Sequence, residues 1–423
     1  MMKDILLKEF IEPERWEYAI ETGVGKGIDK GELRKLCDPI YRQALIGQIL
    51  LDNYEIAPPH QVLIPKDNGE FRTVYVNENI DRIFLSIVND MLFELAKGNI
   101  HPACKSYQKG IGCGKVVQNI SREMSRLNPE IGDVGFKADL SKYFDSVPIT
   151  YIDQEFDYLE NMFGKSKIIN VLRKYYHSDL CFDPDGNLIE HYQSLKQGCA
   201  VASYLADTVL FDIDYEISKL SGIYVRYSDD ILYVGPEIDA AMDILTTKLH
   251  EMQMKLNPKK VEFLARDRWF KFLGFMIKGN QITLSKNRVK DFQKEIESRS
   301  IKKKEVTAKK AINSINRYLY KGDGTYSWAT SVLPIINVEK DINTLNEFVM
   351  DCIRACETGK KKVGGLGCVI DRKDYTILRG TGKNVTANRK KTVKEIDKYK
   401  SLKCMQNALR YSRPVYEALV REM

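Results

Sequence analysis

Two adjacent aspartates are the residues of this chain best suited to chemistry. Asp229 and Asp230 follow Arg226-Tyr-Ser and lie between two short apolar runs, Gly222–Val225 and Ile231–Gly235. Runs of this kind on both sides of a polar turn predict a hairpin that presents both carboxylates. Because neighbouring carboxylates repel each other, the pair needs a cation to hold it together. An Asp-Asp pair is also common in ordinary surface turns, so the interpretation depends on other residues.

A third carboxylate is available at Asp139. Residues 136–147 read Phe-Lys-Ala-Asp-Leu-Ser-Lys-Tyr-Phe-Asp-Ser-Val, which places Asp139 just after a strand-like stretch. Three aspartates can hold two Mg²⁺ ions, which prefer oxygen ligands and neutralise the attacking and leaving oxygens of phosphoryl transfer. We therefore expect Asp139, Asp229 and Asp230 to be both catalytic and metal-binding, with Mg²⁺, or Mn²⁺ in its place.

The pattern of apolar residues predicts the elements that must position these aspartates. Residues 1–55 have apolar positions at helical spacing, and Asp67-Asn-Gly separates two expected strands at 61–65 and 71–76. Strand and helix signals alternate from 134 to 280, and the pattern beyond 285 is helical and rich in lysine. Other expected elements are helices at 79–97, 151–175, 199–220 and 238–254, a turn at 184–186 and the acidic hairpin at 222–235.

Further motifs occur in a fixed order around the aspartates. Phe144 lies five residues after Asp139, and Gln197-Gly198 precedes a helix of small residues. Leu256-Asn-Pro-Lys-Lys260 comes before Phe272-Leu-Gly-Phe275, and Lys66 and Arg72 flank the first expected turn. Taken singly, each motif also fits a core aromatic, a solvated basic pair or a buried strand. Together, over about residues 60–280, they resemble the palm and fingers motifs of reverse transcriptases.

This resemblance implies a fold and a reaction. The fold would be α+β, a right-handed polymerase with fingers, an antiparallel-sheet palm and a helical thumb. We expect an N-terminal helical region and fingers at 1–135, the palm at 136–280, and a basic helical thumb at 281–423. The reaction would be RNA-directed DNA polymerisation, in which deoxynucleoside triphosphates are added to a 3′ end and pyrophosphate is released.

The same resemblance implies roles for individual residues. Lys66, Arg72, Gln197, Gly198 and Lys260 would bind the incoming nucleotide. Phe144 would be the steric gate, whose ring clashes with a 2′ hydroxyl and so favours deoxynucleotides. The primer grip would consist of Phe272, Leu273, Gly274 and Phe275.

The C-terminal region is strongly basic. Residues 371–423 contain fourteen lysines and arginines against six acidic residues, with tyrosines interleaved. Basic charge with aromatic side chains suits a region that grips a nucleic acid by its phosphates and by stacking, although a solvated helix face is the alternative. The candidates for binding nucleic acid here are Arg389, Lys390, Lys391 and Lys394.

One segment points to a branch of the family. Gln197-Gly-Cys-Ala-Val-Ala departs from the Pro-X-Ser-Pro that often follows Gln-Gly in the family, and it resembles bacterial defence-associated enzymes of the unknown groups, in particular the type 2 defence system. That resemblance implies a structured non-coding RNA template that is copied into cDNA during phage infection. The alternatives are an enzyme of a retron or diversity-generating element, an untemplated protein-primed DNA polymerase, and a nucleic-acid-binding protein without catalysis.

The composition of the chain limits the size of its core, its partners and its cellular compartment. A chain of 423 residues with 43% apolar residues can bury a large core, and its net charge of +7 suits a polyanion partner as well as an ordinary basic protein. Nine cysteines without a Cys-X-X-Cys pair, and five histidines, argue against structural zinc and for reduced thiols in the cytoplasm. We expect neither a signal peptide nor a membrane partner, since no apolar run reaches about 18 residues.

Overall fold

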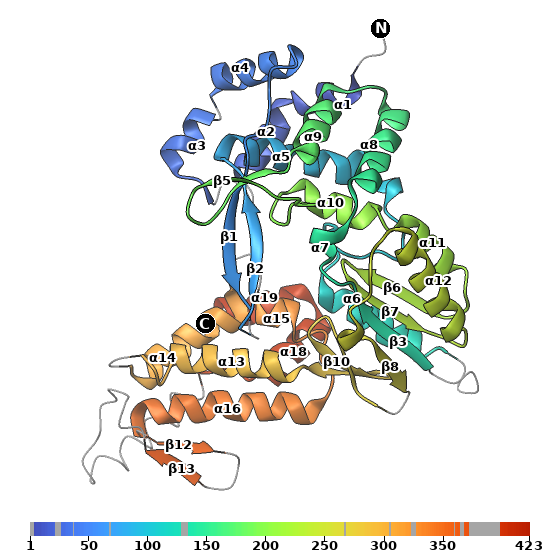
Figure 1. Cartoon of the computed structure of the whole chain (residues 1–423). Coiled ribbons are helices and arrows are strands. Elements are labelled where there is room, and N and C mark those ends of the chain that lie inside the picture. Colours follow the sequence, from blue (N-terminus) through green and yellow to red (C-terminus); the bar gives the residue numbers. More distant parts are fainter. Residues whose placement is uncertain are drawn as a thin grey trace. The chain divides into compact units, whose positions relative to one another are not determined.

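The elements of the chain gather into two compact units (Figure 1). In this computed structural model, unit 1 consists of residues 1–111 and 128–265, and unit 2 consists of residues 112–127 and 266–423. The structure describes residues 4–21, 27–36, 38–66, 69–127, 134–265, 268–303, 306–322, 327–358, 360–363, 368–371 and 398–423.

Unit 1 begins with four short helices, as the helical spacing over residues 1–55 predicts. Asp4 caps the first of them by accepting a hydrogen bond from the backbone N–H of Leu7, and Asp38 caps the fourth, which has Pro39 at its first position. Apolar residues of the first two helices pack against a longer fifth helix. These helices are α1 (Ile5–Phe10), α2 (Pro13–Glu21), α3 (Lys30–Leu36), α4 (Pro39–Leu50) and α5 (Asn79–Leu95).

A four-stranded sheet in the order β2-β1-β4-β5 lies beside these helices. Strands β1 (His60–Pro65) and β2 (Phe71–Val76) pair antiparallel and form the first predicted hairpin, which Figure 1 shows as a long ribbon. Strand β4 (Leu180–Phe182) pairs with β1 in parallel, and β5 (Leu188–Glu190) follows it after the predicted turn at 184–186. The first hairpin is therefore anchored to a later part of the chain.

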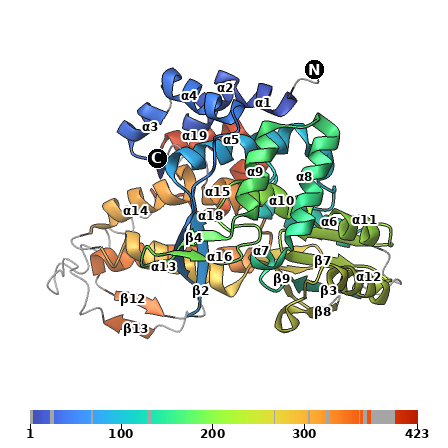
Figure 2. The ribbon, with the colours of Figure 1, turned by 45° about the horizontal axis from the view of Figure 1, so that its top comes forward.

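A second sheet of unit 1 has the order β6-β7-β3-β8 and is antiparallel throughout. Its strands are β3 (Val134–Asp139), β6 (Ile223–Tyr227), β7 (Asp230–Val234) and β8 (Glu262–Ala265). Helices α11 (Phe211–Ser218) and α12 (Ile238–Glu251) pack against it (Figure 2). Phe136 and Tyr233 are fully buried, and their stacked rings, 5.9 Å apart, join β3 to β7.

Two helices predicted as continuous are each divided in two. The segment 151–175 belongs to α8 (Ile149–Phe163) and α9 (Lys167–His177), because Gly164, with φ of 82°, ends α8 and the Ser166 side chain caps α9. The segment 199–220 contains α10 (Val201–Thr208) and α11, which are separated by a turn at 209–210. A single turn, α7 (Tyr143–Ser146), follows β3.

Unit 2 combines α6 (Cys113–Met124) with the chain after β8. Strands β9 (Phe270–Phe272), β10 (Phe275–Lys278) and β11 (Gln281–Leu284) form an antiparallel sheet, against which α6 packs. The rings of Phe292 and Trp328, with centroids 4.3 Å apart, lie in the core of the helical part. The helices there are α13 (Lys286–Arg299), α14 (Ala308–Asn316), α15 (Trp328–Ser331), α16 (Glu339–Thr358), α18 (Leu402–Tyr411) and α19 (Arg413–Arg421).

Beyond residue 285 the pattern predicts helices with a break at 364–367, but the segments on either side of that break are strands and not helices. Strands β12 (Lys360–Val363) and β13 (Cys368–Asp371) pair antiparallel. The sequence between them is Gly-Gly-Leu-Gly, and glycine disfavours helix while permitting tight turns.

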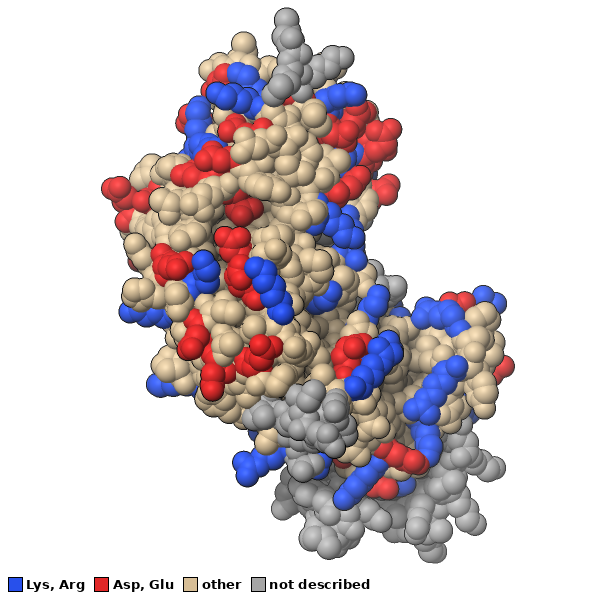
Figure 3. Space-filling view, turned by 90° about the vertical axis from the view of Figure 1, so that its right-hand side faces the viewer, with Lys and Arg blue, Asp and Glu red and all other residues tan. Residues whose placement is uncertain are grey.

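Charged side chains of both signs are interspersed on the face of the molecule drawn in Figure 3. Within the described ranges, no helix has the length and apolar character needed to cross a membrane.

Candidate active site

The acidic hairpin is formed as predicted. Strands β6 and β7 pair with Tyr227 opposite Asp230, which leaves Ser228 and Asp229 as a two-residue turn. Ser228 has φ of 58°, and positive φ at the first turn residue is what a tight hairpin requires to match the twist of its strands. The turn therefore fixes where the Asp229 carboxylate emerges.

Strand pairing brings the third aspartate to the same place. Asp139, the last residue of β3, lies directly opposite Asp230, the first residue of β7. The backbone N–H of Leu140 donates a hydrogen bond of 3.2 Å to the carbonyl of Asp229, which ties the end of β3 to the turn. Three carboxylates that the sequence separates by 90 residues therefore gather at one edge of the sheet.

The electrostatics of the three aspartates reflect this crowding. Burial raises the pKa of Asp229, and the charge of Asp139 raises it further. The pKa of Asp230 is raised to about 6, first by burial and then by the charges of Asp229 and Asp139. Asp139 thus disfavours ionisation of Asp229 and Asp230, and Asp229 disfavours ionisation of Asp230, as expected for like charges held close together.

Lys260 supplies a positive charge at this edge. Its ammonium nitrogen lies 2.6 Å from Asp139 Oδ2. The lysine is carried by a short 3₁₀ turn, Pro258–Lys260, that Asn257 caps, and the backbone N–H of Asn257 donates to the carbonyl of Asp139 at 2.8 Å. Although burial opposes the charged form, the hydrogen bond to Asp139 and the three carboxylates raise the pKa of Lys260.

The carboxylate oxygens of the three aspartates suit magnesium, although the described side chains do not form a complete coordination site. Within the described residues, no group of three or more His, Cys, Asp or Glu side chains has the arrangement needed to hold a metal ion. The chemistry is nevertheless suitable, because three carboxylates face a single lysine and Mg²⁺ prefers oxygen ligands. A divalent cation would offset the remaining negative charge that raises the pKa values of Asp229 and Asp230.

Backbone hydrogen bonds connect Phe144 and the Gln-Gly segment, two of the predicted nucleotide contacts, to the first hairpin. Phe144 lies in α7, and its carbonyl accepts a hydrogen bond of 3.1 Å from the backbone N–H of Leu195, at the start of the Gln-Gly segment. The carbonyl of Gln197 in turn accepts a bond of 2.7 Å from the N–H of Tyr75 in β2. The segment 195–198 therefore joins the first hairpin to the turn that follows Asp139.

Gly198 is required by this arrangement. Its φ is 111°, and a Cβ at this position would lie 2.5 Å from Val74 Cγ1 and 2.7 Å from the carbonyl oxygen of Tyr75. A larger residue would be strained and would push β2 away. The close approach of the two segments accounts for the Gln-Gly step in the sequence.

Comparison with known families identifies the chain's relatives. The model of the family described as "Reverse transcriptase (RNA-dependent DNA polymerase)" matches residues 64–277, just over half of the chain. The chain belongs to the reverse transcriptase family. The expected α+β fold of a right-handed polymerase is confirmed.

Several solved polymerase structures show a remote likeness to this reverse transcriptase. Apo telomerase from Candida tropicalis has 10% identity and a TM-score of 0.45, over 71% of this chain and 58% of that chain. Telomerase from Candida albicans, in complex with a fragment of telomeric RNA, has 12% identity and a TM-score of 0.44, over 87% and 68%. The RNA-dependent RNA polymerase of a human picobirnavirus has 13% identity and a TM-score of 0.47, over 84% and 64%.

The chain spans 58% of the length of the first of these structures. No curated protein matches this reverse transcriptase in sequence.

The basic residues of the first hairpin lie on its exposed surface. Lys66 follows β1 and Arg72 lies in β2 opposite Ile64, and both side chains are exposed. Lys66 is 3.7 Å from Glu70 in an exposed ion pair. Its charge also reaches Asp145: burial raises the pKa of that carboxyl, while Lys142, His191 and Lys66 lower it. Lys66 of this reverse transcriptase therefore lies near the turn that carries Phe144.

Sequence reasoning missed the buried arginine that precedes the acidic turn. Arg226 is fully buried, and its guanidinium donates to both carboxylate oxygens of Asp214 on α11. The same group donates to the carbonyls of Ala206, Asp207 and Ser228, so it fixes the turn against α10 and α11. The signal in the sequence was a charged residue inside an otherwise apolar strand.

A second buried contact holds the turn from the other side. The hydroxyl of Ser106 accepts a hydrogen bond of 2.9 Å from the backbone N–H of Ser228 and donates to a carboxylate oxygen of Asp207. Burial raises the pKa of Asp207 to about 6, against the opposing charge of Arg226. Nothing in the sequence placed Ser106 near the acidic hairpin.

The predicted primer-grip residues belong to unit 2. Phe272 and Phe275 are buried and pair at the ends of β9 and β10, and Leu273 and Gly274 form the two-residue turn between them. Their role stays a prediction. The residues predicted to bind nucleic acid, Arg389, Lys390, Lys391 and Lys394, lie outside the described residues.

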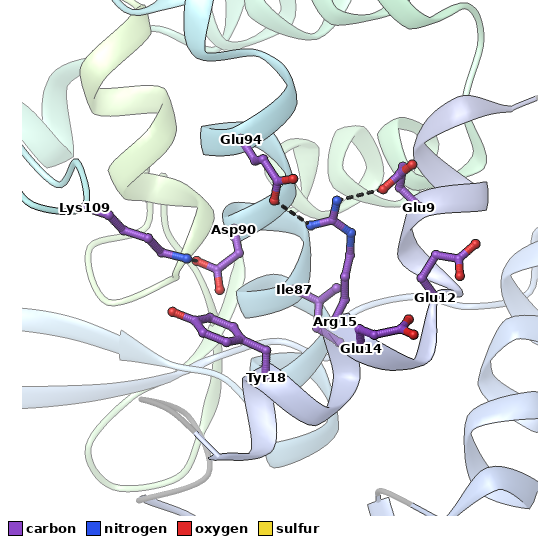
Figure 4. A pocket seen from close by; sticks show the side chains of 9 residues that line it. All are labelled: Glu9, Glu12, Glu14, Arg15, Tyr18, Ile87, Asp90, Glu94 and Lys109. Atoms are coloured by element: carbon purple, nitrogen blue, oxygen red, sulfur yellow. Dashed lines mark hydrogen bonds and ion pairs between the residues drawn. The ribbon is translucent and has the colours of Figure 1, made fainter.

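A cavity of unit 1 lies apart from the aspartates, among α1, α2 and α5 (Figure 4). It has a volume of about 460 Å³. Arg15 donates to Glu9 and Glu94, and Lys109 lies 3.6 Å from Asp90. Carboxylates outnumber basic groups in its lining, so this cavity would repel a triphosphate and is not the nucleotide site.

Proposed function

We propose that this reverse transcriptase polymerises deoxynucleotides at Asp139, Asp229 and Asp230 and copies a dedicated, structured non-coding RNA into cDNA. The observation that carries the catalytic part is the register of β3 and β7, with Asp139 opposite Asp230. The choice of template is supported by the sequence from Gln197 onwards, which resembles that of bacterial defence-associated enzymes. In that setting, synthesis would serve defence against phage in the cytoplasm.

The catalytic edge would work by charge and position. When bound, two Mg²⁺ ions would activate the primer 3′ hydroxyl and stabilise the charge on the leaving pyrophosphate. Asp139, Asp229 and Asp230 would hold these ions. Lys260 keeps a positive charge at the same edge, where it would contact the triphosphate of the incoming nucleotide.

The remaining nucleotide contacts would come from the fingers and from the turn after β3. Lys66 would offer a point charge and Arg72 a bidentate contact to the triphosphate. Gln197 would contact the nucleotide, and Gly198 would let the backbone approach it closely. Phe144 would lie beneath the sugar and exclude a 2′ hydroxyl.

We assign the fingers and N-terminal helices to residues 1–135, the palm to 136–280 and the thumb to 281–423. In this assignment Phe272 to Phe275 grip the primer end. The basic segment that includes Arg389, Lys390, Lys391 and Lys394 would hold the RNA by its phosphates.

The test is to sequence the RNA and DNA that copurify with the tagged protein, beside the variant Asp229→Ala/Asp230→Ala. The proposal predicts one dominant RNA bound by both proteins, and complementary cDNA only with the wild type. A matched variant, Asp185→Asn in an exposed turn, should behave as wild type.

Other results would favour other functions. DNA without a complementary RNA would indicate untemplated, protein-primed synthesis. A cDNA joined to its own RNA, or one that carries adenine-directed changes, would point to a retron or a diversity-generating element. RNA bound equally by both proteins, with no DNA even during phage infection, would leave a binding protein without catalysis.

A further inference from the structure

The turn between β9 and β10 is unusually close to a helix that follows it in unit 2. Leu273 has φ of 47° and Gly274 has φ of 79°, so both turn residues adopt the left-handed conformation. The carbonyl of Gly274 accepts a hydrogen bond of 3.2 Å from the N–H of Ser285, the buried residue that caps α13. This contact fixes the start of α13 against the turn.

Arg288, in the first turn of α13, lies against Gly274 of the turn and Phe275, the first residue of β10. Its guanidinium carbon is 4.3 Å from the ring centroid of Phe275, in a cation–π contact. A Cβ on Gly274 would lie 2.8 Å from Arg288 Nε and 3.2 Å from Cζ, so a larger residue here would displace the guanidinium. The side chain of Arg288 is therefore held in one place by a buried ring and by the backbone.

Among the residues that the structure describes, no carboxylate forms an ion pair with Arg288. Arg299 on the same helix differs: it also stacks on an aromatic ring, that of Tyr318, but it is paired with Glu295. Stacking occupies the face of a guanidinium and leaves the N–H groups at its rim free to donate.

We propose that Arg288 binds a backbone phosphate of the primer strand next to the Leu273–Gly274 turn. This inference rests on the function proposed above, in which that turn grips the primer end. A planar guanidinium binds a phosphodiester with two parallel hydrogen bonds. Because stacking on Phe275 already restricts the side chain, little conformational entropy is lost when a phosphate binds.

The first test measures affinity for a DNA primer annealed to an RNA template, for wild type, Arg288→Gln, Arg288→Lys and Lys290→Gln. Lys290 is exposed on the same helix, two residues away and therefore on another face, so its variant removes one charge elsewhere. We expect Arg288→Gln to weaken binding about tenfold and to reduce the slope of log affinity against log salt by about 0.7–0.9, the value for one phosphate contact.

Lys290→Gln is the control, and Arg288→Lys tests the effect of the charge without the planar guanidinium. Lys290→Gln should match wild type, and Arg288→Lys should keep the salt slope but bind with intermediate affinity, since lysine offers charge without the planar pair of donors. The KM for deoxynucleotides at saturating primer and template should stay unchanged in all of them. Equal losses in Arg288→Gln and Lys290→Gln, or an unchanged salt slope in Arg288→Gln, would overturn the proposal.

The second test identifies the phosphate. Single neutral methylphosphonate linkages are placed in turn along the last nucleotides of the primer or along the template. The proposal predicts one primer position at which the neutral linkage weakens wild type but not Arg288→Gln. Coupling to a template position instead, or to no position in either strand, would contradict it.

These results are separable from failure of the proposed function. If wild type binds primer and template but extends no primer, the polymerase assignment of the aspartates fails, while the phosphate contact is still measured. If wild type extends primers and Arg288→Gln binds them as well as Lys290→Gln does, only the inference about Arg288 fails.

Discussion

The ammonium nitrogen of Lys260 lies 2.6 Å from Asp139 Oδ2, so one of the three clustered carboxylates already has a cationic partner. The other two, Asp229 and Asp230, have raised pKa values, first because they are buried and then because of the charge of Asp139; the charge of Asp229 also raises the pKa of Asp230. In the function proposed above, Lys260 would therefore compete with a metal ion for Asp139 and would also contact the triphosphate. These two roles predict that one substitution of Lys260 has opposite effects on metal binding and on the rate of synthesis.

Replacing Lys260 by Gln should tighten metal binding and slow synthesis. Without the ammonium group, Asp139 is free to join its neighbours around a cation, so Mn²⁺ should bind at lower concentration, as measured by paramagnetic broadening. Turnover should fall about 10²-fold, because a charge that stabilises the transition state is lost. Lys259→Gln, in the exposed neighbour, is the control and should change neither quantity. Weaker Mn²⁺ binding in Lys260→Gln would contradict the competition.

Replacing Phe144 by Ala should relax the choice of sugar. Phe144 is partly buried, with its ring 5.6 Å from that of Tyr143, and it is joined through its carbonyl to the Gln-Gly segment. Removing the ring should improve the use of ribonucleotides relative to deoxynucleotides by about tenfold or more in single-nucleotide extension assays. Deoxynucleotide extension by the same variant controls for general damage. An unchanged ratio of the two substrates would remove the steric-gate role.

Breaking the buried pair between Arg226 and Asp214 should destabilise the protein strongly. Either Arg226→Met or Asp214→Asn leaves a partner buried without its counter-charge, which costs about 3–5 kcal/mol of unfolding free energy. The exposed pair of Lys219 and Glu216 is the control, since Lys219→Gln should change the free energy of unfolding only slightly. Chemical denaturation measures both. Similar losses for the buried and exposed pairs would show that Arg226 does not anchor the acidic turn.

Glu155 should make the stability depend on pH. Burial raises its pKa to about 7, with a hydrogen bond to Thr208 opposing this, so the folded state holds a proton that the unfolded state releases nearer its ordinary value of 4.5. The folded protein therefore loses stability as pH rises from about 4.5 through 7.

Glu155→Gln removes that ionisation. Its melting temperature should exceed that of wild type by a few degrees at pH 8, and the difference should disappear as the pH falls below 4.5, where the wild-type carboxyl becomes protonated in both states. A difference that is constant across this pH range would show that the ionisation of Glu155 is not the cause.

Local sequence signals predicted the parts of the site that are local in the structure. The hairpin at Ser228 and Asp229 follows from apolar strands on both sides of a polar turn, and a strand ending at Asp139 follows from the residues before it. The register that sets Asp139 opposite Asp230 was expected only through the family's motif order. Strand pairing over 90 residues depends on the whole sheet, which periodicity does not specify.

For the same reason, the sequence could not predict the buried contacts that hold the acidic turn. Ser106 donates to Asp207, 101 residues away, and Arg226 meets Asp214 only because α11 packs against β6. The division of the predicted helix 151–175 could have been seen at Gly164, where a glycine ends α8 two residues before a capping serine. The local positions of the three aspartates, at a strand end and in a hairpin turn, were therefore predictable, but the buried groups that hold them were not.

The most direct test of the central claim is incorporation of a labelled deoxynucleotide into a DNA primer annealed to an RNA template. Wild type, Asp229→Asn/Asp230→Asn and the control Asp185→Asn are compared with Mg²⁺, with binding of primer and template measured alongside. We predict that wild type and Asp185→Asn add only the nucleotides complementary to the template, while the double variant binds as well but adds none. Equal incorporation by the double variant would contradict the assignment of Asp139, Asp229 and Asp230 as the catalytic centre.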